Sequence, residues 1–488
     1  MPSAGSEGTP GIRIPHRSTE GTAVSNGTSH IRHEHETSGA IPRRSAVRAA
    51  AIALTATALT LSLGALTPAG AAVQPADRAV IEAVEQHAHR LRTTEPGTPG
   101  RDLTALVALA QDASIVGVGE ATHGSKELFQ LKDRLFRQLV KKAGYTTFSL
   151  ETSWSSGVRL DQYIRTGQGD LRQIMREEFQ GSYADWNNEQ FLNLFTWMRA
   201  HNRDAAPGEQ LRVMGNDVND ADPRQYERIL AWTAEHRPAL LPELRRRYTA
   251  LLALPAEMGE RTKKWLAMPQ EERKALDRDA SAAYRLLEQS GAADPWVLQE
   301  ARVIAQMTSV LSLDLLDPVA GAEANRLRDR AMAENTVWWQ RHTGGKVLVS
   351  AHNAHLGYES AFPASHPVVQ GAYFRELVGR EYLAVGTTIQ SGEYWATDTR
   401  TGEPGVFSTG PAAPGSNEHT LDRVHHRDYY VDLRRVKRDP AAARWLDGAR
   451  PTFVVPSGYP SEPLDVSLGR SFDVLVHLHH VQAMTHPR

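Results

Sequence analysis

The sequence contains no cysteine among its 488 residues. Disulfide bonds, thiolate nucleophiles and zinc sites built on cysteine are therefore excluded. The chain also lacks an excess of charge of either sign, because 55 Lys and Arg face 57 Asp and Glu, for a formal net charge of −2. No overall positive field would draw such a chain to nucleic acid or to an anionic membrane surface. We therefore expect a small-molecule substrate, while the composition fixes no oligomeric state.

The common motifs of covalent hydrolases and of nucleotide-binding enzymes are missing as well. The sequence has no G-x-S-x-G elbow, no S-x-x-K pair, no Walker A loop and no H-E-x-x-H zinc helix. Histidines and carboxylates remain as the groups that could carry chemistry. These side chains suit the direct activation of water by general-base catalysis.

The first 71 residues differ in composition from the rest of the chain. Residues 1–42 are rich in Gly, Ser, Thr and His and poor in apolar residues, which predicts a disordered N-terminal extension. Residues 43–71 place Arg43 and Arg44 before an uncharged Ala/Leu-rich run and end in small residues, the layout of a secretory signal peptide. We therefore expect a secreted protein. An uncleaved leader that anchors the chain in a membrane is the alternative.

Short apolar runs, each followed by polar residues, recur through residues 72–488, which we predict to form one α/β domain. The predicted strands are 114–119, 146–150, 211–215, 346–351, 381–388, 450–455 and 472–476. Helical patterns between the strands favour right-handed crossovers and a mostly parallel sheet covered by helices. Residues from about 223 to 341 predict an α-helical insertion, and the Gly- and Pro-rich segment 390–422 predicts a long loop.

Polar side chains that follow these strands form the candidate site. In a parallel sheet such residues gather along one edge, where ligands bind. The residues that we expect to meet there are Glu120, His123, Glu151, Asp217, His352 and His355. A histidine can accept a proton from water at neutral pH, and a carboxylate on its other ring nitrogen fixes its tautomer. The set therefore predicts a hydrolase in which a second histidine, His352 or His355, stabilises the oxyanion.

Other interpretations of the histidines stay open. Two or three histidines with a carboxylate also suit zinc or manganese, so a metal-dependent hydrolase is the alternative to a cofactor-free one. A non-catalytic secreted protein that binds a small molecule or a glycan is the third hypothesis. His477, His479 and His480 form a separate cluster, which we expect at a sheet edge or in the tail, with His477 and His479 on one face of a strand.

Five short motifs occur along the chain. They are Gly117–Gly124 (GVGEATHG), Leu150–Glu151, Gly215–Asp217 (GND), Arg328–Asn335 (RDRAMAEN) and Ala351–His355 (AHNAH). Together, and in this order, they resemble the erythromycin esterase family over roughly residues 78–485. The resemblance implies an α/β sheet with a helical insertion. It also implies hydrolytic opening of a macrolide lactone by histidine-activated water, without a covalent intermediate.

The resemblance assigns roles to individual positions. His123 matches the catalytic base of the family, and Glu120 and Glu151 match its acidic neighbours, while the pair His352 and His355 matches the histidines of a second strand.

Two further positions are candidate substrate contacts, Lys132 and Asp217. Lys132 falls in a helix where macrolide-cleaving members have an arginine. Because lysine lacks the planar fork of arginine, any bidentate contact at this point would change, which weakens the expectation of a macrolide substrate.

Overall fold

The structure, a computed structural model, describes residues 75–206, 208–291 and 294–486. The expected N-terminal extension, residues 1–42, and the expected signal peptide, residues 43–71, lie outside the described residues. Within the described ranges, every helix is too short or too polar to cross a lipid bilayer.

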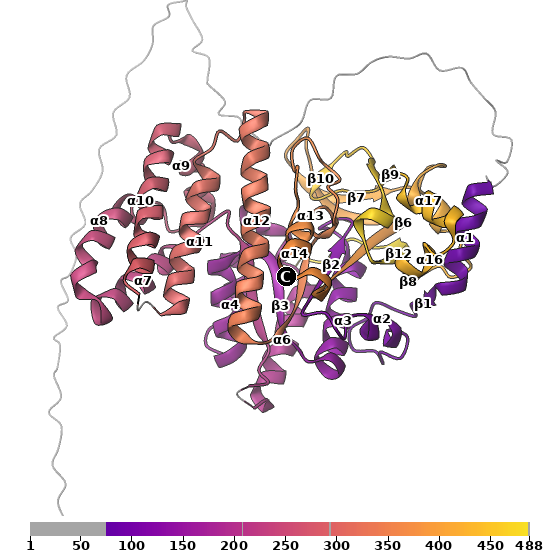
Figure 1. The fold of residues 1–488 in the computed structure, drawn as a ribbon, viewed down its shortest axis with the longest axis horizontal. Helices are drawn as coiled ribbons and strands as arrows, with labels where there is room; N and C mark the ends of the chain where they lie inside the picture. Colours follow the sequence, from indigo (N-terminus) through magenta and orange to yellow (C-terminus); the bar gives the residue numbers. More distant parts are fainter. Residues whose placement is uncertain (1–74, 207, 292–293, 487–488) are drawn as a thin grey trace, which may run out of the picture. The chain divides into compact units, whose positions relative to one another are not determined.

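One large, mostly parallel β-sheet organises the described residues (Figure 1). Its strands lie in the order β1-β8-β12-β6-β2-β5-β3-β4, with β7 and β10 beside the far end of β6. Neighbours from β12 to β4 run parallel, whereas β8 and β1 add an antiparallel edge. The bounds are β1 His89–Arg90, β2 Ile115–Glu120, β3 Tyr145–Ser153, β4 Arg212–Asp217, β5 Lys346–His352, β6 Tyr382–Asp398, β7 Pro404–Thr409, β8 Tyr429–Asp432, β10 Gly458–Tyr459 and β12 Val474–Val481. The predicted fold class is confirmed.

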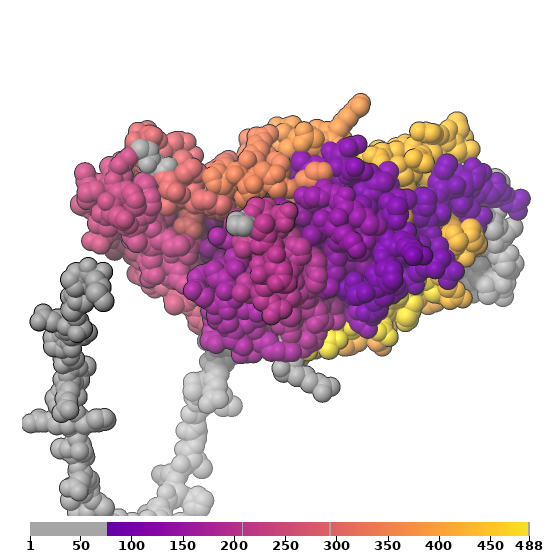
Figure 2. Space-filling model, turned by 90° about the horizontal axis from the view of Figure 1, so that it is seen from below, coloured from indigo at the N-terminus to yellow at the C-terminus, as the bar shows by residue number. Residues whose placement is uncertain are grey.

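Helices cover both faces of the sheet, because successive side chains of a strand point to opposite sides. In β2, Val116 and Val118 join one hydrophobic core and Ile115 joins the other. The first core is covered by α2 (Thr104–Leu109), α3 (Lys126–Ala143), α4 (Trp154–Thr166), α5 (Leu171–Glu178) and α6 (Glu189–Asp204), which fill the middle of the face in Figure 2. The second is covered by α1 (Pro75–His87), α12 (Pro318–Thr343), α14 (Gln370–Val378), α16 (Leu433–Val436) and α17 (Pro440–Asp447).

The segment between β4 and β5 consists mainly of helices (Figure 1). It contains α7 (Pro223–His236), α8 (Leu241–Leu252), α9 (Met258–Ala267), α10 (Gln270–Gln289), α11 (Pro295–Leu311) and α12. Asp222, Asp294 and Asp317 begin α7, α11 and α12 by accepting hydrogen bonds from free backbone N–H groups of the first turn, and each is followed by proline. These helices occupy the region for which the sequence predicts an insertion, about 223–341.

The C-terminal part differs from the prediction in its strands. Segment 390–422, expected as a loop, contains the second half of β6, its hairpin partner β7 and helix α15 (Asn417–Leu421). The run 450–455 forms only β9 (Arg450–Thr452), which pairs with β11 (Leu464–Val466) outside the main sheet. The run 472–476 marks only the start of β12, which extends to Val481.

A glycine- and serine-rich composition obscured the hairpin. Along β6 the side chains of Tyr394 and Ala396 are buried while those of Glu393 and Thr397 are exposed, the alternation expected of a strand. Gly392 and the flanking polar residues hide this short alternation in the sequence. Local composition therefore suggested a loop where cross-strand pairing with β7 makes a strand.

The C-terminal histidines also differ from the prediction. His477 is fully buried, and β12 lies between β8 and β6 rather than at the edge of the sheet. The edge prediction is wrong because the four-residue strand β8 was not recognised. That His477 and His479 share a face is confirmed, since both contact Asp422 Oδ1, at 3.3 Å and 2.6 Å.

Candidate active site

The carboxyl ends of β2, β5, β3 and β4 lie side by side at one edge of the sheet. Glu120 is the last residue of β2 and pairs in register with His352, the last residue of β5. Glu151 lies near the end of β3, and Asp217 ends β4. Residues far apart in the sequence thus meet at one edge because parallel strands present the same ends to it.

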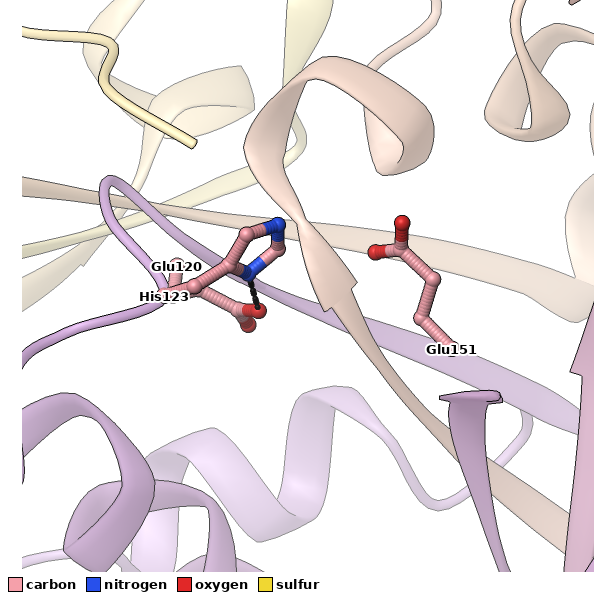
Figure 3. Close-up of side chains that lie close together, drawn as sticks. All are labelled: Glu120, His123 and Glu151. Atoms are coloured by element: carbon pink, nitrogen blue, oxygen red, sulfur yellow. Dashed lines mark hydrogen bonds and ion pairs between the residues drawn. The ribbon is translucent and has the colours of Figure 1, made fainter. Parts of the chain in front are cut away.

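His123 lies in the loop after β2 and is held by Glu120 (Figure 3). Its Nδ1 is 2.9 Å from Glu120 Oε1. The His123 backbone N–H donates to the Pro456 carbonyl at 3.0 Å, and the next carbonyl, that of Gly124, accepts from the Trp395 N–H at 3.0 Å. Within the described residues, Nε2 has no hydrogen-bond partner. The ring is therefore oriented through one nitrogen while the other is available.

His123 is 8% exposed, and burial controls its charge. Burial lowers the pKa of His123 below 6.5, although the carboxylates of Glu151 and Asp185 act in the opposite direction. The imidazole is therefore neutral at neutral pH. Because Glu120 accepts from Nδ1–H, the lone pair resides on Nε2. The Glu151 carboxylate lies across from the ring (Figure 3).

Lys132, on α3, has no exposed surface and contacts the second oxygen of Glu120, Oε2. Its Nζ also lies 3.0 Å from Ser350 Oγ and 3.3 Å from the Ala351 carbonyl oxygen. The predicted contact of Lys132 with substrate stays a prediction; in this structure the side chain is buried and faces Glu120 and β5. Burial lowers the pKa of Lys132 well below its usual range, and the charge of Glu151 acts in the opposite direction. The direct contact with the Glu120 carboxylate favours the charged form, so Lys132 balances the charge of Glu120 and fixes the position of its carboxylate.

Glu151 is an ionised carboxylate surrounded by donors. Its Oε1 accepts from Arg328 Nη2 at 3.1 Å and lies 3.3 Å from His355 Nε2, while Oε2 accepts from the backbone N–H of His352 at 3.1 Å. Burial would raise the pKa of Glu151, but the charges of His355 and Arg328 and the hydrogen bond from His355 outweigh it and hold the pKa well below 4.5. Glu151 therefore contributes a fixed negative charge.

His355 is the charged histidine of the site. It lies in α13 (Asn353–Leu356), and its Nδ1 is 2.6 Å from the buried carboxylate of Asp329. Burial would lower the pKa of His355, but Asp329 and Glu151 outweigh it and raise the pKa to about 10. Both ring nitrogens of the imidazolium thus point at carboxylates, which leaves neither directed at a substrate.

His352 is a neutral histidine with both ring nitrogens occupied. Its Nε2 lies 3.2 Å from the Ala121 carbonyl, and its Nδ1 accepts from the Ala354 N–H at 3.3 Å. Burial and the proximity of His123 hold the pKa of His352 well below 6.5. The prediction that His352 donates to an oxyanion disagrees with this geometry, since its one N–H is taken by Ala121.

Arg328 lies on α12, a helix of the insertion, and contacts residues at the carboxyl ends of β3 and β4. Its Nε and Nη2 donate to the two oxygens of Asp217 at 2.9 Å and 2.7 Å. Asp217 is fully buried and holds Arg328 in place, while its predicted contact with substrate stays a prediction. Arg328 was missed as a site residue, although it begins the motif Arg328–Asn335 and is therefore visible in the sequence.

Comparison with known proteins now decides the family. The family model for erythromycin esterase matches residues 140–481. The chain belongs to the erythromycin esterase family. YbfO of Bacillus subtilis (strain 168), named as a hydrolase, is 22% identical over 420 residues, which cover 82% of this chain and 90% of YbfO. Erythromycin esterase type II of Escherichia coli is 24% identical over 373 residues, which cover 69% of this chain and 85% of the esterase. These matches support a hydrolase.

A solved structure shares the fold of this erythromycin esterase family member. A protein from Bacillus cereus superposes with a TM-score of 0.76 at 29% sequence identity, over 84% of this chain and 99% of the other. The resemblance read from the motifs is therefore confirmed at the level of family and fold.

The 3-10 helix η1 (Gly181–Trp186) brings further residues to the site of this family member. The Tyr183 hydroxyl donates to Asp217 Oδ2 at 3.0 Å, and Trp186 Nε1 donates to the Glu151 carbonyl at 2.7 Å. The Trp186 ring also meets that of His123 edge-on, with centroids 4.8 Å apart. Sequence reasoning missed η1 because it lies between helices, away from every strand end.

A metal ion fits the site of this family member poorly. Glu120, His123 and Glu151 could each offer an atom within 4.8 Å of the others. However, Glu120 already contacts Lys132, and Glu151 already contacts Arg328. A divalent cation would meet these positive charges at close range, and it would have to compete with them for the carboxylates.

Proposed function

We propose that this protein hydrolyses an ester or a lactone with water activated by His123, without a covalent intermediate. The observation that carries the proposal is the 2.9 Å hydrogen bond between His123 Nδ1 and Glu120 Oε1, which leaves the Nε2 lone pair available. A water between Nε2 and the substrate carbonyl gives its proton to His123 as its oxygen attacks. Glu120 stabilises the imidazolium that forms.

In this proposal, Arg328 stabilises the negative charge that develops on the carbonyl oxygen of the substrate. Its Nη1 lies 3.4 Å from His355 Nε2 and forms no other hydrogen bond among the described residues. Because His355 is an imidazolium, both atoms are donors and form no hydrogen bond with each other, so Nη1 keeps its hydrogens for a substrate. A donor aimed at an oxyanion contributes about 3 kcal/mol to stabilisation of the transition state.

Replacement of the base tests the proposal. His123→Gln removes the proton acceptor at Nε2 and is expected to lower kcat by about 10²–10⁴-fold, the usual contribution of a general base. Thermal unfolding of the variant checks that the fold is kept. His236→Gln, a change at an exposed position of α7, serves as the matched control and leaves kcat unchanged. Near-full turnover in folded His123→Gln would overturn the assignment.

The substrate class is best found by product analysis. The purified protein is incubated with macrolide lactones and with simple esters, and the products are weighed by mass spectrometry. Hydrolysis adds the mass of one water to a lactone and splits an ester. A ligand that binds but gives no such product with any compound would favour the third hypothesis, a non-catalytic binding protein.

We propose that the reaction needs no metal ion and no cofactor. The proposal rests on Lys132 and Arg328, which already neutralise the carboxylates that a metal would use. Dialysis against a chelator is expected to leave kcat unchanged. Loss of activity that one added divalent ion restores would favour the metal-dependent alternative instead.

We propose that the protein is exported, on the basis of residues 43–71. The expected observation is chain in the culture medium with an N-terminus near residue 72, found by N-terminal sequencing. Chain that stays in the membrane fraction at full length would favour the anchored alternative. Small molecules, rather than nucleic acid or a membrane, are its proposed partners, since the net charge is only −2.

A further inference from the structure

Asp185 is a carboxyl group beside the site with no role in the mechanism above. It lies in η1 between Tyr183 and Trp186, both of which contact residues of the site. Its Oδ2 accepts a hydrogen bond of 2.7 Å from Ser457 Oγ. Within the described residues its Oδ1 has no hydrogen-bond partner, and the residue is only partly buried. One oxygen is therefore held and the other is available.

Two connections bring the segment that carries Asp185 close to His123, and each of the two groups shifts the pKa of the other. The ring of Trp186, the following residue, packs edge-on against the His123 ring at 4.8 Å. Ser457, which holds the carboxyl, directly follows Pro456, whose carbonyl accepts from the His123 N–H at 3.0 Å. Asp185 is thus fixed from its own helix and from the loop before β10.

The surroundings of Asp185 raise its pKa. Burial raises the pKa of Asp185, while His123, the Ser457 hydroxyl and His486 act in the opposite direction without cancelling the rise. The cations Arg328 and His355 bind Glu151 and Asp329 instead. A carboxyl group whose pKa is raised and that is bound to no Lys or Arg is the kind of group that acts as a general acid.

We propose that Asp185 is the acid that protonates the leaving alcohol, a role that rests on the proposed function of the site. His123 Nε2 takes a proton from water as the C–O bond to the carbonyl carbon forms. When the tetrahedral intermediate expels the alcohol, the C–O bond to the leaving oxygen breaks and that oxygen takes the Asp185 proton. The proton on His123 then passes to the Asp185 carboxylate, which restores both groups. The balance is one ester and one water giving one acid and one alcohol.

The dependence on the leaving group tests this role. Two esters of one acid are compared, one of an activated phenol and one of a simple alkanol. A phenolate leaves without help, whereas an alkoxide needs a proton. Asp185→Asn is therefore expected to lower kcat/KM about 100-fold for the alkyl ester and little for the phenyl ester. The amide can still accept from Ser457, so the fold is kept, which thermal unfolding checks.

Two more variants sharpen the experiment. Ser457→Ala removes the hydrogen bond to the Asp185 carboxyl. It is expected to lower kcat/KM less than Asp185→Asn does, and again more for the alkyl ester than for the phenyl ester. Asp204→Asn, at an exposed end of α6, is the matched control and changes neither rate. If Asp185→Asn is too unstable to assay, the leaving-group pattern of Ser457→Ala decides.

Each outcome separates this role from the proposed function. Equal losses with both esters, or no loss with either, overturn the role of Asp185. If His123→Gln is inactive at the same time, the His123 mechanism stands and only the acid is wrong. If the wild-type protein hydrolyses neither ester nor any lactone of the panel, or if folded His123→Gln keeps its activity, the proposed function fails and Asp185 loses its role with it.

Discussion

Buried carboxylates of the site are each matched with a cation. The pairs are Glu120 with Lys132, Glu151 and Asp217 with Arg328, and Asp329 with His355. His123 differs, because burial keeps it neutral and only its Nδ1 is engaged. In the proposed mechanism His123 is the base, so its protonation is expected to lower activity on the acid side of neutrality.

Activity is expected to depend on the pKa of His123. Protonated His123 cannot accept a proton, so kcat/KM is high at neutral pH and falls as the pH drops through the pKa of His123. Because burial depresses that pKa, the fall lies below pH 6.5. The pH profile of kcat/KM measures it. A fall centred above pH 6.5 would contradict a buried neutral base.

Lys132 is expected to act on stability through Glu120. Lys132→Met leaves the Glu120 carboxylate buried without its cation, which costs about 3–5 kcal/mol. Urea denaturation measures the loss. The matched control is Lys263→Met, because Lys263 pairs with Glu260 on the surface, where their side chains are 75% and 59% exposed. This exposed pair should contribute nothing measurable. Similar midpoints for both variants would contradict the role given to Lys132.

At the scale of elements, the loop after β2 is locked to β6 through Gly124. A Cβ at Gly124 would lie only 2.0 Å from the backbone carbonyl oxygen of Trp395. Gly124→Ala therefore forces the loop and β6 apart, at a cost of about 1–3 kcal/mol, and moves the adjacent His123. The unfolding temperature and kcat of Gly124→Ala should both be lower than those of the wild type.

The control for this change is another glycine of the β6–β7 region. Gly410 has open space around its Cβ position, so Gly410→Ala should change neither the unfolding temperature nor kcat. Unchanged kcat in Gly124→Ala would show that His123 does not depend on the close contact between the loop and β6.

The sequence predicted those elements whose signal is local. Fully buried parallel strands read as continuous apolar runs, so the run 346–351 indicated β5 and placed His352 at its end. Arg328 lies 111 positions from its partner Asp217, and no periodicity connects them. Helix η1 carries Asp185 and Trp186 but follows no strand. Side chains that reach the site from such elements become visible only once the fold is known.

The direction of side chains was equally hidden. Asp217 follows the strand-end pattern of the site residues and Lys132 came from the family resemblance, yet both side chains are fully buried. Whether a polar side chain at a sheet edge faces a substrate or a neighbouring charge depends on packing between distant elements. The pattern of polar residues after strands indicated which side chains meet at the sheet edge. It did not indicate which of them face solvent.

At the scale of the whole molecule, the charged network couples stability to pH. His355 has a pKa of about 10 in the folded state, above its ordinary value of 6.5. Its contribution to the free energy of unfolding is therefore complete below about pH 6.5 and is lost as the pH rises toward 10. Glu151, whose pKa is held well below 4.5, contributes above that value and loses its contribution as the pH falls. Together these shifts favour a stability maximum between the two windows.

Asp329→Asn separates the His355 contribution from the rest. The amide no longer raises the pKa of His355 through its charge, so the variant should be less stable than wild type at pH 6 and approach it at pH 10. Unfolding by urea across this range gives both curves. The expected sign is a stability difference that shrinks as the pH rises, because wild type alone loses the paired proton. A difference that stays constant from pH 6 to pH 10 would mean that the pair stabilises the fold only by packing.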